Sequence, residues 1–163
     1  EYIDVIDEEG NVVGRATKEQ VIKNKLLHRG VNVFVFNSKG ELFVHKRSNN
    51  LLHYPGMYDV KFSGDLRSGE KYYEAAKREL GEEAGIKDTN LEFLFELRTR
   101  RKEENVDHQA FSCIWDGPIA LDPNECEHGK FMKLEKIKIL MWERRLSPSA
   151  EQVLREFLKR EGK

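Results

Sequence analysis

The sequence predicts an α/β fold in which a mixed β-sheet is flanked by helices. Residues 31–36 are apolar on both faces, as in a buried central strand, and amphipathic helices are expected over 70–84 and after Pro148. The order of strands, helix, strands and helix is typical of a sheet whose faces are covered by helices. Because the 163 residues contain no repeat and no linker, we expect one domain over 1–163.

The first segments are expected to form a strand, a turn and a short helix. Residues 2–6 are rich in β-prone side chains, and the acidic stretch 7–11 contains a glycine, as turns do. Thr17 followed by Gln20 fits a capping box, in which each side chain satisfies a backbone N–H at the start of a helix. Apolar residues at helical spacing then continue to Leu26.

The central strand over 31–36 is interrupted only by Asn32. The turn residues 37–40 lead to a predicted hairpin partner over 41–45. Residues 58–62 are β-prone and form the next predicted strand.

The second half of the chain is expected to alternate between helices and strands. Residues 70–84 form the first long helix. Ser147 and Pro148 open the last one, whose apolar residues recur at helical spacing up to Leu158. Further strands are predicted over 91–99, 109–115 and 131–134.

The composition argues against several classes of partner. Lys plus Arg is 28 and Asp plus Glu is 29, so the formal net charge of −1 gives no electrostatic case for a nucleic acid polymer or an anionic membrane. No stretch approaches the roughly 18 apolar residues of a membrane span, and the sequence begins without a basic and then apolar signal segment. Two cysteines are too few for a disulfide framework and fit a reducing compartment. We therefore expect a cytoplasmic protein.

The helix predicted over 70–84 contains the residues that point to a chemical function. Glu79, Glu82 and Glu83 stand at i, i+3 and i+4, so their carboxylates project from one side of the helix. Taken alone, this pattern favours a solvated acidic face. The carboxylates also adjoin an apolar stripe, however, and hard Mg²⁺ or Mn²⁺ would remove their mutual repulsion. The helix therefore suggests a metal site for a phosphorylated ligand.

The spacing around this helix resembles the Nudix box, G-x5-E-x7-R-E-U-x-E-E-x-G-U, in which U is a bulky aliphatic residue. The match spans residues 64–86 and fills all nine specified positions. They are Gly64, Glu70, Arg78, Glu79, Leu80, Glu82, Glu83, Gly85 and Ile86.

The resemblance implies a Nudix fold, an α/β/α sandwich, and a hydrolase that cleaves a small-molecule nucleoside diphosphate derivative with Mg²⁺ or Mn²⁺. It implies that Glu79, Glu82 and Glu83 are the metal ligands, with Glu82 the first candidate to activate the attacking water. Glu70 and Arg78 are implied to form an ion pair that orients the loop. Gly64 and Gly85 are implied to give the backbone freedom on either side of the helix.

Outside the box, four residues are candidates for the site. Glu125 lies on a predicted loop where many Nudix enzymes carry a further acid, and is a second candidate for the general base; a plain surface charge is the competing interpretation. Arg47 suits phosphate oxygens, although a solvated arginine at the end of a hairpin explains it equally well. Tyr58 and Phe62 alternate on one predicted strand and are candidates to stack on a base, although aromatic residues at strand spacing usually belong to a core.

The segments flanking the box resemble the isopentenyl diphosphate isomerase branch of the Nudix superfamily, from Tyr2 to about Pro148. Isomerases of this branch use a cysteine in a Cys-x-His motif. Here Phe62 falls at or near the cysteine position and Gly64 at the histidine position. The resemblance therefore implies a hydrolase related to the isomerases.

Two other functions remain open at this stage. One is an isopentenyl diphosphate isomerase, which the stretch 62–64 disfavours. The other is a Nudix module that binds a nucleotide without turnover, which the intact box disfavours. The sequence leaves the substrate undetermined and leaves open whether the protein is a monomer or a homodimer.

Overall fold

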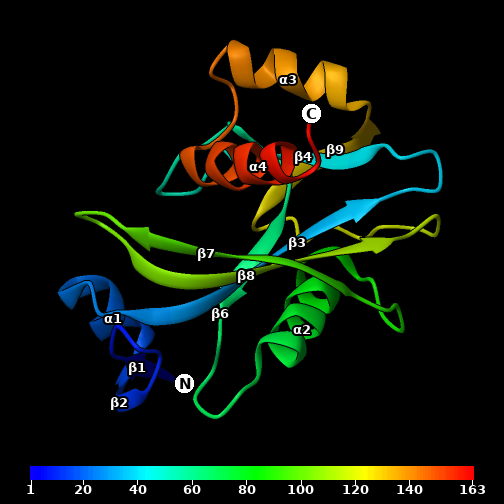
Figure 1. Ribbon diagram of the computed structural model, residues 1–163. Helices are drawn as coiled ribbons and strands as arrows, with labels where there is room; N and C mark the ends of the chain where they lie inside the picture. The colour runs from blue at the N-terminus through cyan, green and yellow to red at the C-terminus, as the bar shows by residue number, and fades with distance from the viewer.

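The computed structural model describes all 163 residues, Glu1–Lys163. A seven-stranded sheet runs in the order β5-β4-β3-β8-β7, with β6 paired to β3 and β9 paired to β4 (Figure 1). Strands β3 and β8 are parallel, and the other pairs are antiparallel, so the sheet is mixed as predicted. The strands are β3 (His28–Phe36), β4 (Leu42–Arg47), β5 (Tyr58–Asp59), β6 (Phe62–Asp65), β7 (Glu92–Arg100), β8 (Asn105–Ile114) and β9 (Cys126–Met132).

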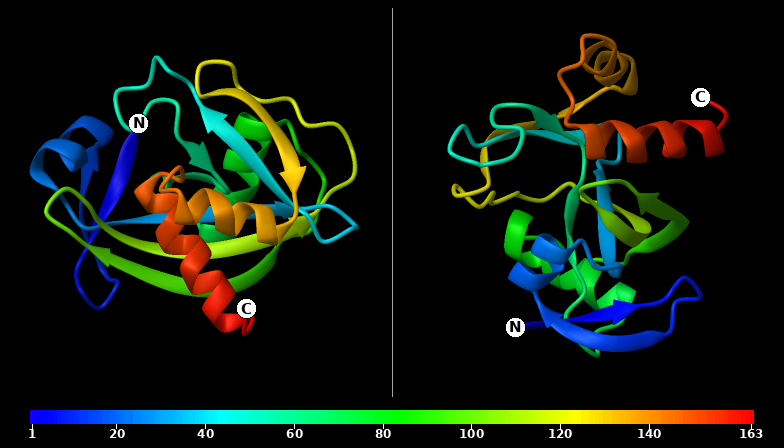
Figure 2. Two further views of the ribbon diagram at one scale, coloured as in Figure 1. Left: turned by 90° about the horizontal axis from the view of Figure 1, so that it is seen from above. Right: turned by 90° about the vertical axis from the view of Figure 1, so that its left-hand side faces the viewer.

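Helices cover both faces of this sheet. Helix α2 (Tyr72–Ala84) packs on one face, and α3 (Leu134–Trp142) with α4 (Pro148–Arg160) packs on the other. The right-hand view of Figure 2 shows α3 and α4 above the sheet and α2 below it. The predicted arrangement of a mixed sheet between helices is confirmed.

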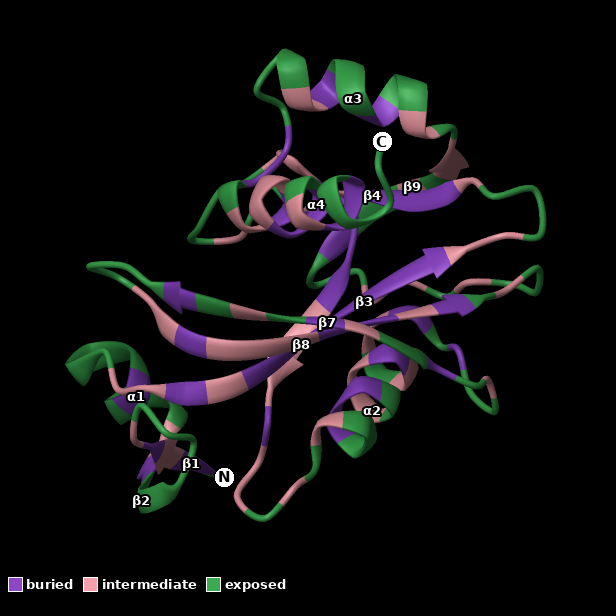
Figure 3. Ribbon diagram, in the orientation of Figure 1, coloured by how far each residue is buried: buried purple, intermediate pink, exposed green.

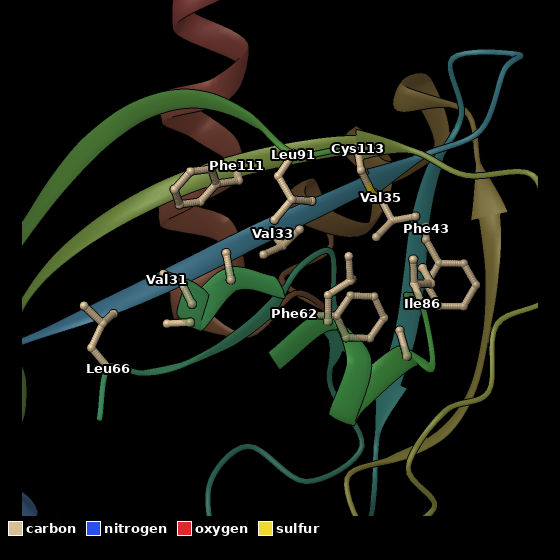
Figure 4. Close-up of a cluster of buried hydrophobic side chains, with 14 residues drawn as sticks. Val31, Val33, Val35, Phe43, Phe62, Leu66, Ile86, Leu91, Phe111 and Cys113 are labelled. Carbon is tan, nitrogen blue, oxygen red and sulfur yellow. The ribbon is translucent and has the colours of Figure 1, made fainter. Parts of the chain in front are cut away.

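The position of β3 between two hydrophobic cores explains why its sequence is apolar on both faces. Val31, Val33 and Val35 point into the core beneath α2, where Figure 4 shows them beside residues of neighbouring elements. Phe34 points to the opposite core, formed with α3 and α4. Figure 3 shows β3 buried along much of its length, whereas the outer face of α3 is exposed.

A small two-stranded sheet precedes the main one. It consists of β1 (Tyr2–Ile6) and β2 (Val12–Thr17), followed by α1 (Lys18–Asn24). The predicted capping box is present, because the Thr17 side chain accepts from the N–H of Gln20 and the Gln20 side chain accepts from the N–H of Thr17. We call residues 1–24 the N-terminal lobe; it lies at the end of the molecule away from α3 and α4 (Figure 2).

The structure differs from several of the local predictions. Strand β2 and helix α3 were not predicted, and the strand predicted over 131–134 is instead β9, which ends at Met132, because Leu134 already begins α3. The segment 58–62 is not one strand: it divides into β5, which pairs with β4, and β6, which pairs with β3. Strand β4 pairs with its predicted hairpin partner β3 only at Leu42 opposite Phe36, because β4 then diverges to pair along its length with β9.

None of the helices has the length and apolar character that crossing a membrane requires.

Candidate active site

The box segment forms the end of β6, a loop and helix α2. The helix ends at Gly85, whose φ of +66° is the left-handed conformation that glycine adopts without strain. The N–H of Gly85 donates to the carbonyl of Gly81. The terminating glycine of the motif therefore has the physical role expected of it.

Arg78 ties the loop to the helix. Its Nε and Nη2 donate to the two carboxylate oxygens of Glu70 at 2.8 and 2.9 Å, and Nη2 also donates to the carbonyl of Asp65 at 3.0 Å. A fork of this kind fixes orientation as well as distance. The ion pair between Glu70 and Arg78 is thus present, and it joins both ends of the loop to α2. The same arginine donates from Nη1 to Glu79 at 2.7 Å.

Gly64 lies directly against the carboxylate of Glu79. A Cβ built at Gly64 would overlap the carboxyl group of Glu79, so only a residue without a side chain leaves room for it. Burial raises the pKa of Glu79, and the charge of Glu82 adds to this rise, whereas Arg78 opposes it. The close packing of β6 against α2 therefore fixes the Glu79 carboxylate beside Gly64.

Glu83 is the most strongly perturbed acid of the helix. Its Oε2 accepts from the backbone N–H of Ser63 at 3.1 Å. Burial and, after it, the nearby charge of Glu79 raise the pKa of Glu83 to about 8, although the charge of Lys61 opposes this rise. Two neighbouring carboxylates that resist ionisation are typical of functional sites, where a cation relieves the conflict.

Glu82 differs from the other two carboxylates in being open to solvent. Its side chain is 51% exposed, against 13% for Glu79. Its nearest partners are the guanidinium of Arg67, at 3.5 Å, and that of Arg78, at 3.4 Å. The Glu82 carboxylate is therefore accessible to water, whereas Glu79 and Glu83 are partly buried.

The donor set fits a hard divalent cation in its chemistry, because it consists of carboxylate oxygens whose repulsion such an ion would relieve. The side chains do not converge as predicted, however: no three His, Cys, Asp or Glu side chains are grouped to hold a metal ion. Glu79 and Glu83 are partly buried, while Glu82 lies near Arg67 and Glu79 is bound by Arg78. Binding a cation through all three carboxylates requires Glu79 and Glu82 to exchange their arginine partners for the ion.

Glu125 lies on a loop that is fastened to the end of α2. The N–H of Asp122 donates to the carbonyl of Glu83 at 3.2 Å, and the N–H of Glu125 donates to the carbonyl of Asp122 at 3.0 Å. The Glu125 residue is exposed, and its charge acts on the thiol of Cys126 together with the charge of Glu83. The structure therefore brings Glu125 into the vicinity of the box carboxylates.

Arg47 is held at the end of β4 by the following loop. Its Nη2 donates to the carbonyl of His53 at 2.8 Å, and its Nε lies 3.3 Å from the carbonyls of His53 and Tyr54. The guanidinium is bound only by carbonyl oxygens, so its charge has no carboxylate partner. Its positive charge is therefore available to an anionic ligand.

The prediction that Tyr58 and Phe62 lie on one strand is wrong, because Tyr58 is on β5 and Phe62 is on β6. Tyr58 packs against the core beneath α3 and α4 and lies under the guanidinium of Arg145, 5.0 Å from the ring centroid. Phe62 is 2% exposed in the core beneath α2 and stacks on the ring of His45 at 4.8 Å. Because the chain passes from β5 to β6 between them, the alternation does not persist, and the buried Phe62 ring offers no free face for a base.

Sequence reasoning overlooked a set of buried polar groups beside Glu83. Asp59 and Lys61 are each 4% exposed and form an ion pair of 3.5 Å between Oδ2 and Nζ. His45 and Cys126 are also buried, and the sulfur lies 3.0 Å from His45 Nδ1. Charged residues at alternate positions of an otherwise apolar strand, Asp59-Val60-Lys61, were the available signal.

The comparisons with known proteins agree with this architecture. A family model described as the NUDIX domain matches residues 26–157. An uncharacterized Nudix hydrolase of Yersinia pestis is 33% identical over 84% of this chain and 75% of its own length. The uncharacterized Nudix hydrolase YfcD of Escherichia coli is 30% identical over 100% of this chain and 89% of its own length.

Solved structures share the fold. A crystal structure from Deinococcus radiodurans matches with a TM-score of 0.81 and 22% identity, covering 96% of this chain and 98% of that one. The NUDIX domain of NrtR from Shewanella oneidensis, solved with ADP ribose, matches with a TM-score of 0.64 and 14% identity, covering 89% and 99%. These structures share the fold, and the match to the NUDIX domain together with the two relatives shows that the chain belongs to the Nudix hydrolase family, whose members act on pyrophosphate bonds.

Proposed function

We propose that this protein is a pyrophosphohydrolase that requires a divalent metal and cleaves the diphosphate linkage of a nucleoside diphosphate derivative, with water attacking phosphorus. The observation that supports this most directly is the pair of partly buried carboxylates, Glu79 and Glu83, lying against the Ser63–Gly64 backbone. Such a pair of oxygen donors suits an ion that must also meet phosphate oxygens.

Glu79, Glu82 and Glu83 would hold Mg²⁺ or Mn²⁺, together with a carbonyl near Gly64. Once bound, the ion offsets the negative charge of the diphosphate and acidifies a water, which contributes several kcal/mol. Glu82 is exposed and suited to accept the proton of the attacking water. Glu125, on the loop beside α2, is the second candidate for this role.

Arg47 is the residue of this chain best suited to bind the substrate. Its guanidinium is fixed by two carbonyls and has no acidic partner, which leaves its charge for phosphate oxygens. Tyr58, on the neighbouring strand in register with Lys46 of β4, is the second candidate to contact the substrate. Phe62 is excluded as a substrate contact because its ring is buried in the core and stacked on His45.

Within the family, we place this chain with the hydrolases related to isopentenyl diphosphate isomerase, on the sequence flanking the box. The isomerase reaction needs a protonating group after the Pro-Gly turn, where this chain has Phe62, Ser63 and Gly64. Incubation with isopentenyl diphosphate in D₂O should therefore give no deuterium exchange.

Both cysteines are free and buried, which supports a reducing cytoplasm as the place of the activity.

The first test is a hydrolysis screen in which the products are identified. The panel contains nucleoside di- and triphosphates, ADP-ribose, dinucleotides and isopentenyl diphosphate, each with Mg²⁺ or Mn²⁺. ADP-ribose is included because the NrtR domain was solved with it. We expect turnover of one class, and its loss in Glu83→Gln, which keeps the shape of the side chain and removes its charge.

Two results would contradict the proposal. Turnover that persists in Glu83→Gln, or without a divalent ion, would place the chemistry elsewhere. A folded protein that binds a nucleotide and metal yet hydrolyses nothing in the panel would favour a binding module.

A further inference from the structure

A buried chain of polar contacts runs from β9 to the helix of the box. It begins at Cys126, passes through His45 on β4 and Lys61 between β5 and β6, and ends at Ser63, whose N–H holds Glu83. None of these four residues belongs to the nine positions of the box. The chain therefore connects the far edge of the sheet with a carboxylate of the candidate site.

Lys61 is the centre of this chain, because both its backbone and its side chain are fixed. Its N–H donates to Asp59 Oδ1 at 3.1 Å, and its carbonyl lies 3.0 Å from His45 Nε2. Its ammonium lies 3.5 Å from Asp59 Oδ2 and donates to Ser63 Oγ at 3.3 Å. Lys61 thus lies between β5 and β6, and its ammonium contacts one residue of each strand, Asp59 and Ser63.

His45 has one tautomer that fits its neighbours. The carbonyl of Lys61 accepts hydrogen bonds only, so Nε2 carries the proton, and Nδ1 is left to accept from the thiol of Cys126 at 3.0 Å. Its ring is also stacked on Phe62, with an angle of 3° between the planes. The imidazole therefore fixes the carbonyl of Lys61 from β4 while packing against the next residue.

A buried ion pair of this kind is costly for stability. Asp59 and Lys61 are each almost fully removed from water, and pairing in a protein interior often fails to offset the loss of hydration. A well-packed apolar pair would fold at least as well at such a position. The hydrogen bond from Lys61 to Ser63 places this ion pair next to the backbone N–H that holds Glu83, which points to a role at the site.

We propose that Lys61 is a positioning residue for the hydrolytic reaction: anchored by Asp59 and His45, it fixes Ser63, and the Ser63 N–H in turn holds one oxygen of Glu83 so that the other oxygen faces the site. This inference rests on the proposed function, because it assigns Glu83 a role in that reaction. Lys61 itself need not touch the substrate.

The test compares charge-balanced variants. Lys61→Met alone leaves Asp59 buried without its partner and endangers folding, so the informative protein is Asp59→Asn/Lys61→Met, in which both charges are absent. The control is Lys46→Met, which breaks the ion pair of a neighbouring lysine with Glu127, 3.3 Å away on β9. All proteins are compared by thermal unfolding and then assayed with the substrate found in the screen.

We expect the double variant to fold and to lose roughly ten- to a hundredfold in kcat, with KM within about twofold, since a catalytic group misplaced by about 1 Å can cost about 10²-fold. Lys46→Met should retain the kcat of the unmodified protein. In a Ser63→Ala background, where the Oγ partner is already missing, the double change should cost clearly less, because contacting residues are not additive.

A second readout does not depend on activity. Hydrogen exchange of the Ser63 amide, followed by NMR on protein without metal, should be at least tenfold faster in the double variant, while the amides of β3 keep their protection. A double variant with unchanged kcat and unchanged Ser63 exchange would overturn the assignment of Lys61. If the unmodified protein has no hydrolase activity, the proposed function fails, and the exchange experiment alone then decides whether Lys61 positions Glu83.

Discussion

Gly64 is the residue of the motif whose identity the structure explains most fully. A glycine is required there because the carboxylate of Glu79 occupies the space of a side chain. The sequence predicted backbone freedom as the reason, but Gly64 has no positive φ, and the close approach of α2 is the actual cause.

The substitution Gly64→Ala tests this explanation. The new methyl group must displace Glu79, so we expect kcat to fall by about 10²-fold, with a loss of stability of about 1–3 kcal/mol from overpacking. Assay and urea denaturation measure both. Gly14→Ala is the matched control, because a Cβ at Gly14 meets no atom within 4 Å. Full activity in Gly64→Ala would show that Glu79 moves without consequence.

The raised pKa of Glu83 predicts that the stability of the folded protein falls as the pH rises. Its folded pKa, about 8, lies above its ordinary value of 4.5, so the folded protein retains a proton that the unfolded chain releases. The stability contributed by this group is therefore full below about pH 4.5 and is lost progressively as the pH rises toward 8.

Glu83→Gln should remove this dependence in protein without metal. Relative to the variant, the unmodified protein should lose at least about 1 kcal/mol in free energy of unfolding between pH 5.5 and pH 8. Urea denaturation at the two pH values measures the difference. Parallel pH profiles for the two proteins would mean that Glu83 titrates as it does in water.

At the scale of elements, the N-terminal lobe is fastened to the loop of the box by one buried carboxylate. Asp4, 7% exposed on β1, accepts from Ser68 Oγ at 2.6 Å, from the N–H of Gly69 at 3.0 Å and from Arg29 at 3.1 Å. These hydrogen bonds lower the pKa of Asp4 against the effect of burial. The lobe lies outside the residues 26–157 that match the family model, yet it contacts the box directly.

Asp4→Ala should therefore loosen the loop as well as the lobe. We expect a loss of about 2–3 kcal/mol in stability, because an arginine and two further donors lose a charged acceptor. Hydrogen exchange of the Ser68 and Gly69 amides should become faster. Glu9→Ala, an exposed change in the same lobe, should stay within about 0.5 kcal/mol. Unchanged exchange at Gly69 would contradict the contact.

The elements that the sequence predicted well are those whose own residues carry the signal. Helix α4 begins at Pro148, is capped by the side chain of Ser147, and buries its apolar stripe. Strand β2 and helix α3 escaped prediction because most of β2 is exposed and α3 buries only Ile137 and Leu140. The division of 58–62 depends on two different partner strands, which local residue preference does not encode.

At the scale of the whole molecule, the proposed metal site couples ligand binding to stability. An ion that binds only the folded protein raises its free energy of unfolding, by about 2.7 kcal/mol at a hundredfold excess over Kd. We expect Mg²⁺ at that excess to raise Tm by roughly 5–10 °C, and to raise it much less in Glu83→Gln. Glu74→Gln, an exposed change on the same helix, should respond as the unmodified protein does. An equal shift in all three proteins would indicate binding elsewhere.

Local periodicity was enough to predict the mixed α/β architecture, and the resemblance of residues 64–86 to the Nudix box pointed to the family and to the ion pair between Glu70 and Arg78. The different exposure of the three carboxylates, the place of Phe62 in the core and the position of Lys61 and His45 near Glu83 follow from the three-dimensional arrangement instead. Burial and pairing depend on strands that meet from distant parts of the chain, and the preferences of a single segment cannot specify that meeting.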